Sequence, residues 1–186
     1  HHTASAVALI GGGSHPRPGE LSLAHEGVLF MDELPEFDRR VLEVLREPLE
    51  SGRVSISRAA YKVDLPARVQ LIAAMNPCPC GYLGEDRCDC SLDRVRRYRS
   101  KLSGPLLDRI DIHAEVPQLA MSRLRTAPAG ESTAVVAERV AKAQAVQLAR
   151  NGCVNAQLAT SKLESVCAME PALGRLLDSA ADRLGL

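Results

Sequence analysis

The fold is decided by the stretch Gly27-Val-Leu-Phe-Met-Asp-Glu-Leu-Pro35. Four apolar residues in a row, Val28–Met31, are typical of a parallel β-strand that is covered on both faces. Two carboxylates follow at once, at the end of the strand where open α/β sheets bind their ligands. Asp32 and Glu33 therefore predict either a ligand-binding edge or an acidic strand end that caps the helix expected after Pro35.

A helix, a hairpin and a second strand follow along the chain. Residues 36–49 carry apolar side chains on one helical face and predict a single helix. Residues 53–65 alternate apolar and polar side chains in two runs, which predicts a β-hairpin. The apolar run Val69–Met75 predicts a second buried strand, and Asn76 follows it. The amide of Asn76 either points at the ligand of the first strand's carboxylates or serves turn chemistry before a proline.

Length and composition allow a substantial core. The chain has 186 residues, of which 46% are hydrophobic, enough for one large domain or for one and a half smaller ones. Its 23 basic and 23 acidic residues cancel, so a nucleic-acid surface has to be a local patch. No apolar run in the sequence approaches the roughly 18–20 residues of a membrane span, and no signal peptide opens it. We therefore expect a cytoplasmic protein with no membrane partner.

Residues 3–26 are rich in glycine and proline and include the triplet Gly11–Gly13. They predict a loop-rich insertion, with one strand or hairpin, that adds no element to the core. The triplet is expected to be a flexible loop, because a phosphate-binding Walker A loop needs Gly-x-x-x-x-Gly-Lys-Ser/Thr. The sequence has no lysine before Lys62.

Four cysteines lie close together as two Cys-x-Cys pairs around a seven-residue loop: Cys78, Cys80, Cys88 and Cys90. In an apparently cytosolic chain, cysteines are more natural as metal ligands or free thiols than as disulfides. Four neighbouring thiolates can converge on Zn²⁺, so a structural zinc site and a set of reduced thiols are both open. An iron–sulfur centre is less favoured. Cys153 and Cys167 are expected to be small buried side chains.

The segment 91–103 is basic, with four arginines and Lys101 around Tyr98. It predicts a solvated helix face, with a phosphate or nucleic-acid patch as the alternative. Residues 110–116 are strand-like. Arg109, within Asp-Arg-Ile-Asp, is expected on its own to form a structural ion pair.

From about Gln118 the composition changes to alanine-rich periodic segments. These segments predict helices over 131–150, about 160–168 and 171–184. We therefore divide the chain into an α/β core at 1–117, a linker at 118–130 and a small helical domain at 131–186.

Several motifs in one order resemble those of the magnesium-chelatase-like AAA+ ATPases, most closely the bacterial ComM/YifB group. They are Gly27-Val-Leu-Phe-Met-Asp-Glu-Leu-Pro-Glu-Phe37, Leu45-Arg-Glu-Pro-Leu-Glu-Ser-Gly52, Ala74-Met-Asn-Pro77 and Ser103-Gly-Pro-Leu-Leu-Asp-Arg-Ile-Asp111. The resemblance covers nearly the whole chain and is strongest over 1–117. It implies part of an AAA+ P-loop sheet sandwich with a β-hairpin insertion, followed by a small all-α lid domain.

The resemblance also implies a role for each polar residue of the site. Asp32 matches the Walker B residue that holds Mg²⁺, and Glu33 matches the acid that activates the attacking water. Asn76 matches sensor 1, which positions that water near the γ-phosphate of ATP. Arg109 matches the arginine finger, which reaches into the site of the neighbouring subunit in a ring that we expect to be a hexamer.

The hairpin 53–65 resembles the pre-sensor-1 insertion of this clade, and residues 3–26 resemble its helix-2 insertion. In related ring helicases such hairpins face the central channel. Arg53, Arg58 and Lys62 are therefore the candidates for contact with DNA, with ordinary surface charges as the alternative.

The chain departs from the family pattern at three points, the first of which is the family's amino-terminal domain, which it lacks. The Walker A loop and the sensor 2 arginine are not in the sequence, so we expect a piece of a longer protein. Such a piece should bind ATP poorly and hydrolyse little or none. The resemblance does not imply zinc, since the cysteine set varies within the family.

Three functions remain open at this point. The first is an Mg²⁺- and ATP-dependent ring motor that remodels DNA, in branch migration during recombination or natural transformation. The second is the motor subunit of a metal chelatase, which should show no dependence on DNA. The third is a non-catalytic zinc-binding or interaction module.

Overall fold

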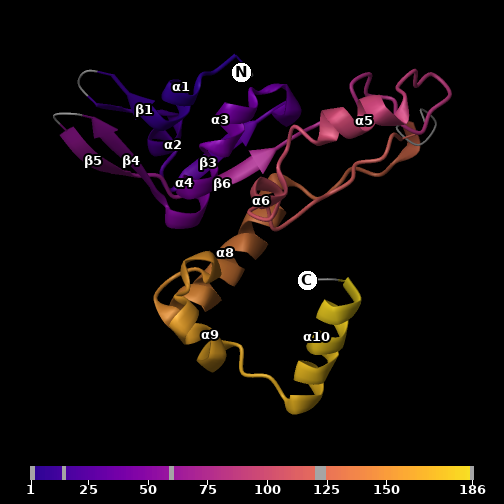
Figure 1. Ribbon diagram of the computed structural model, residues 1–186. Coiled ribbons are helices and arrows are strands. Elements are labelled where there is room, and N and C mark those ends of the chain that lie inside the picture. The colour runs from indigo at the N-terminus through magenta and orange to yellow at the C-terminus, as the bar shows by residue number, and fades with distance from the viewer. Residues whose placement is uncertain (1–2, 14–15, 59–60, 120–124, 185–186) are drawn as a thin grey trace. The chain divides into compact units, whose positions relative to one another are not determined.

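The computed structural model describes residues 3–13, 16–58, 61–119 and 125–184, without the side chains of Arg58 and Tyr61 (Figure 1). The chain forms two compact units, residues 1–116 and 117–186, which we call the core unit and the helical unit. The core unit mixes short helices with three two-stranded sheets. The predicted mixed α/β part with a helical carboxyl-terminal region is confirmed.

Strands β3 (Gly27–Met31) and β6 (Val69–Ala73) pair in parallel over their whole length, with Met31 opposite Ala73. Leu29 and Met31 face the core, whereas Val28 and Phe30 on the other face are 54% and 60% exposed. The prediction that both faces of this strand are covered is therefore wrong for the described residues. Side chains alternate along a strand, and the core unit packs against only one of the two faces.

The predicted single helix over 36–49 is also wrong, because the segment forms three short pieces. They are η1 (Leu34–Glu36), α3 (Arg39–Glu43) and α4 (Arg46–Ser51). Pro48 has no N–H to donate to the carbonyl of Val44, four residues earlier, so the ladder of α-helical hydrogen bonds is interrupted. Between α3 and α4, Leu45 N donates only three residues back, to Leu42 O at 3.2 Å. The predicted apolar face is confirmed: its residues lie in the core, with Phe37, Val41, Leu42 and Leu45 buried.

The predicted hairpin is confirmed as β4 (Arg53–Arg58) and β5 (Tyr61–Pro66), which pair antiparallel. Val54 and Ile56 point inward and join the core. This placement ties the hairpin to the same core as the parallel sheet.

Residues 3–26 contribute to the core, contrary to the prediction. They form α1 (Ala6–Ile10), a small antiparallel pair of β1 (Gly11–Gly12) and β2 (Arg17–Pro18), and α2 (Glu20–Leu23). Leu9 and Leu21, one from each helix, are buried. A Cβ on Gly11 would lie 2.2 Å from Arg17 O, so that glycine serves the close approach of the two strands.

The rest of the core unit contains α5 (Leu92–Arg99) and α6 (Gly104–Leu107). Residues 110–116 form no strand, so that prediction is wrong; no described strand pairs with them, and Val116 is 91% exposed. A strand needs a neighbour for its backbone hydrogen bonds.

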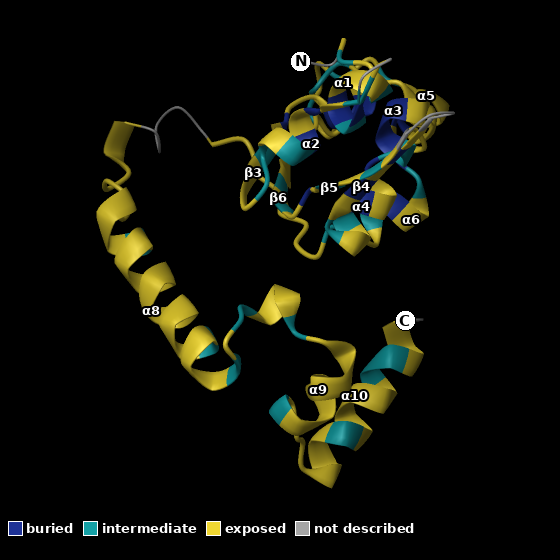
Figure 2. Ribbon diagram, turned by 90° about the vertical axis from the view of Figure 1, so that its left-hand side faces the viewer, coloured by how far each residue is buried: buried dark blue, intermediate teal, exposed yellow. Residues whose placement is uncertain are grey.

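The helical unit contains α8 (Thr133–Asn151), η2 (Asn155–Gln157), α9 (Thr160–Val166) and α10 (Pro171–Leu184), which confirms the predicted helical segments. Among its described residues none is buried, as Figure 2 shows for α8 to α10. Cys153 is half-buried and Cys167 exposed, so their predicted burial is wrong. None of the helices described here has the length and apolar character needed to cross a membrane.

Candidate active site

The polar residues that follow β3 and β6 emerge at one edge of the parallel sheet. Ala74 N donates to Met31 O, and Leu34 N donates to Ala74 O, both at 2.9 Å. These two bonds clamp the dipeptide between Met31 and Leu34 against the end of β6. Asp32 and Glu33 are exposed there, and Asn76, two residues after Ala74, is exposed as well.

The backbone of Glu33 is in the left-handed region, with φ 51° and ψ 45°. Only one other non-glycine residue in the described part of the chain has a positive φ. This conformation costs about 1–3 kcal/mol and is concentrated at functional sites. Asp32 Oδ1 accepts a hydrogen bond from Glu33 N at 2.8 Å, which holds the strained turn.

Helix capping does not account for Glu33. Glu33 is the residue before η1, yet its side chain makes no cap hydrogen bond to that helix. The alternative interpretation as an acidic helix cap is therefore unsupported at this residue.

Asn76 is held between the cysteine loop and α5. Its Cγ lies 3.9 Å from the position that a Cβ on Gly81 would occupy. Tyr98 is buried on α5, beside the backbone of Asn76. Burial raises the pKa of Tyr98, and the charge of Glu36 raises it further, against the opposing effect of the Asn76 backbone.

Sequence reasoning missed the burial of Tyr98 and placed it on a solvated helix face. The spacing Val95, Tyr98 and Leu102 marks an inward helical stripe that could have shown its burial. The charges around it have local partners: Arg94 pairs with Asp89 and Arg96 pairs with Asp93. The solvated helix face is thus the better-supported interpretation of this segment.

Arg109 contacts α4, and its described ion pair does not involve the residues that follow β3 and β6. Its Nη2 donates to Glu50 Oε2 of α4 at 2.8 Å, and both side chains are substantially exposed. Ion pairs this exposed contribute little to stability. The contact agrees with a structural ion pair and leaves Arg109 at the surface.

The hairpin charges can be placed only in part. Arg53 and Lys62 are exposed, on β4 and β5 respectively. Arg53 lies at the base of the hairpin opposite Pro66, and Lys62 lies opposite Ser57 near its tip. The side chain of Arg58 lies outside the described part of the chain.

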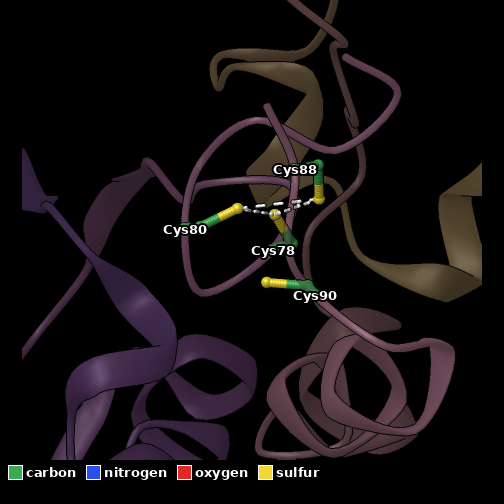
Figure 3. A group of neighbouring side chains, drawn as sticks. All are labelled: Cys78, Cys80, Cys88 and Cys90. Atoms are coloured by element: carbon green, nitrogen blue, oxygen red, sulfur yellow. Dashed lines mark hydrogen bonds between the residues drawn. The ribbon is translucent and has the colours of Figure 1, made fainter. Parts of the chain in front are cut away.

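The four clustered cysteines converge, as Figure 3 shows. Cys78 Sγ lies 3.4 Å from Cys80 Sγ and 3.9 Å from Cys88 Sγ, and Cys80 Sγ lies 3.6 Å from Cys88 Sγ. With Cys90, all four sulfur atoms lie within 4.8 Å of one another. Cys78 is fully buried, and all four are free thiols.

Cys78 and Cys90 of this cluster differ in how readily their thiols ionise. Burial raises the pKa of Cys78, but hydrogen bonds from Cys80, Gly81 and Cys90 outweigh it and lower that pKa to about 7. Burial and the neighbouring thiols raise the pKa of Cys90 to about 12. One thiolate is therefore favoured, and a second negative charge beside it is opposed.

Comparison with known proteins gives the same family over both units. Residues 1–124 match the family model described as magnesium chelatase, subunit ChlI, and residues 130–186 match the model of the ChlI carboxyl-terminal region. The whole chain is 48% identical to competence protein ComM of Haemophilus influenzae and 46% identical to YifB of Escherichia coli. The chain spans 37% of the length of each of these relatives.

A more distant similarity extends over half of the chain. Over 94 residues it is 33% identical to the DNA replication licensing factor mcm-6 of Caenorhabditis briggsae, and these residues are 11% of that protein.

Proposed function

The chain belongs to the magnesium chelatase family, and on this premise we propose that it carries the hydrolytic half of an AAA+ ATPase site in a motor that remodels DNA. The observation that carries the proposal is the clamped edge where β3 and β6 end together. It presents two carboxylates, one on a strained backbone, beside a strand that leads to Asn76. The remaining parts of the sheet sandwich and the Walker A loop would lie in sequence outside this chain, whose relatives are longer.

The donor set fits the group that the family implies. Exposed carboxylate oxygens are ligands that Mg²⁺ prefers, usually together with waters and phosphate oxygens. Asp32 has one oxygen engaged with Glu33 N and would turn the other toward the metal shell. Mg²⁺-ATP, when bound, supplies the phosphoanhydride bond that is broken.

Each residue of the edge then has one task. Glu33 would orient the attacking water and accept its proton, and its fixed left-handed backbone limits where the carboxylate can point. Asn76 would hold the same water by its amide, with the buried Tyr98 beside its backbone. Arg109 would serve the site of a neighbouring subunit in a hexameric ring, which explains its position at the surface.

The DNA part of the proposal rests on the relatives. ComM is named a competence protein, and mcm-6 is named a DNA replication licensing factor. Arg53, Arg58 and Lys62 of the hairpin would contact the phosphate backbone in the ring channel, and the motor would work in the cytoplasm on branched DNA.

Replacing Glu33 by Gln in the longer protein that contains this chain tests the site. ATP turnover should fall about 10²–10⁴-fold, because the general base is lost, while ATP binding is retained. Glu138→Gln, an exposed glutamate of α8 paired with Lys142, is the matched control and should keep full turnover. Normal turnover by Glu33→Gln would refute the assignment.

The description of the family model favours one second candidate, the motor subunit of a metal chelatase. The two functions differ in their response to DNA. Branched DNA should stimulate ATP hydrolysis by the DNA-remodelling motor, whereas a chelatase motor should respond to its partner subunits alone. If no DNA stimulates ATP hydrolysis, the chelatase motor becomes the favoured function and the DNA-remodelling motor the alternative.

A further inference from the structure

The geometry points to a structural zinc site at Cys78, Cys80, Cys88 and Cys90, which fastens the loop after Asn76 to the start of α5. This inference does not depend on ATP hydrolysis, because it concerns the loop itself. It goes beyond the family, whose implied cofactors are Mg²⁺ and ATP.

The sulfur atoms already lie at the separations that one tetrahedral ion requires. Zn–S bonds of about 2.3 Å place any two sulfur ligands about 3.8 Å apart. The three sulfur–sulfur separations among Cys78, Cys80 and Cys88 are 3.4, 3.6 and 3.9 Å, and Cys90 completes a set within 4.8 Å. Only small side-chain shifts separate this arrangement from a closed Cys₄ site.

The ligand set selects the metal. Four thiolates in a tetrahedron suit Zn²⁺ or a single iron, and a site closed by four protein ligands is structural, since no position stays open for a substrate. A cluster with several iron atoms spreads its sulfur ligands over those atoms, which this tight group does not allow. The sulfur atoms are also too far apart for disulfides, whose S–S bond is about 2.05 Å.

A tight turn holds Cys78 and Cys80 close together. Gly81 N donates to Cys78 O at 3.0 Å, which closes the turn over residues 78–81. Gly81 has φ +84°, a conformation that glycine adopts without strain at the end of such a turn. The turn therefore fixes the backbone of two of the four ligands.

Short turns and side-chain contacts, such as the ion pair of Arg87 with Glu85, hold the loop in place of regular structure. Residues 76–91 contain no helix or strand in the structure, and Tyr82 and Leu83 are exposed. Yet the loop packs Gly81 against Asn76 at one end, and Ser91 caps α5 at the other. Arg99 Nε, at the far end of α5, donates to Pro77 O at 3.3 Å, so the beginning of the loop contacts α5. A metal ion would supply the fixed geometry that burial does not.

The test measures bound metal in the 186-residue chain purified without added zinc. Mass spectrometry of the native protein and elemental analysis should find about one equivalent of Zn²⁺. The double variant Cys78→Ser/Cys88→Ser should lose at least nine tenths of it. The matched control Cys153→Ser/Cys167→Ser removes two thiols outside the cluster and should keep the full equivalent.

Cobalt substitution gives a readout that is independent of folding defects in the variants. The unmodified chain with Co²⁺ in place of zinc should show the strong visible bands of a tetrahedral thiolate site. Less than about a tenth of an equivalent of zinc in the unmodified chain, iron in its place, or equal loss in both double variants would each overturn the assignment.

Discussion

The core unit and the helical unit are both ordered, but for different reasons. Every buried hydrophobic side chain that the structure describes lies in the core unit, between Leu9 and Leu106. The helical unit has amphipathic helices with good local signals, such as the Ser132 cap and Gly152 end of α8, and leaves apolar residues such as Leu176 exposed. The comparison teaches that strain such as that at Glu33 needs a packed unit to sustain it.

A pair of arginines, one in each unit, tests whether the residues needed for ATP turnover lie in the core unit alone. Arg109 and Arg139 each form an exposed ion pair with a glutamate at 2.8 Å, one in each unit. In the longer protein Arg109→Ala should lower ATP turnover about 10³–10⁵-fold with little change in ATP binding, because transition-state charge loses its partner. Steady-state hydrolysis and nucleotide titration provide the measurements.

Arg139→Ala is the control and should change turnover less than about twofold. Equal effects of the two substitutions would mean that Arg109 is structural. Loss of nucleotide binding by Arg109→Ala would place it in its own subunit's site.

A pair of leucines tests the contrast in packing. Leu42 is 1% exposed, and Leu42→Ala should lower the free energy of unfolding by about 2–5 kcal/mol through lost burial and a cavity. Leu173 on α10 is 51% exposed, and Leu173→Ala should change it by less than about 0.5 kcal/mol. Urea unfolding of the chain, followed by circular dichroism, measures both; similar losses would show that the helical unit has a core of its own.

A pair of glycines gives the smallest effect. Gly52 ends α4 with φ +69°, and Gly152 ends α8 with φ +71°, so alanine is strained by about 1–2 kcal/mol at each. At Gly52 the new Cβ would also lie 2.7 Å from Arg68 Cγ, whereas at Gly152 no atom of the described residues lies within 4 Å. Gly52→Ala should therefore cost more, as measured by thermal unfolding, and the reverse order would contradict the described packing.

The sequence predicted those elements whose pattern is local. The two strands β3 and β6, the hairpin and the three helical segments follow from apolar runs, alternation and helical periodicity. The break before Pro48 could also have been predicted, because the missing N–H is a property of one residue.

The misses concern contacts between distant segments. Burial of Leu9 and Leu21 depends on how the glycine-rich segment 3–26 packs against the core. The approach of Gly81 to Asn76 depends on the conformation of the whole loop between β6 and α5. Pattern reasoning likewise expected a second cover over β3, because a continuous apolar run does not say which elements of the chain supply it. The roles of Asp32, Glu33, Asn76 and Arg109 stay predictions.

The parallel sheet has a consequence for handling the protein. Within the described part of the chain β3 and β6 form a sheet of two strands, so each is an edge strand with a row of backbone donors and acceptors that no described strand pairs. Val28, Phe30 and Ile72 lie exposed on one face of these same strands. Open edges beside an apolar face are a template for adding strands from another chain, so the isolated polypeptide should aggregate with rising concentration. Colloidal stability would then be acquired only when further strands complete the sheet.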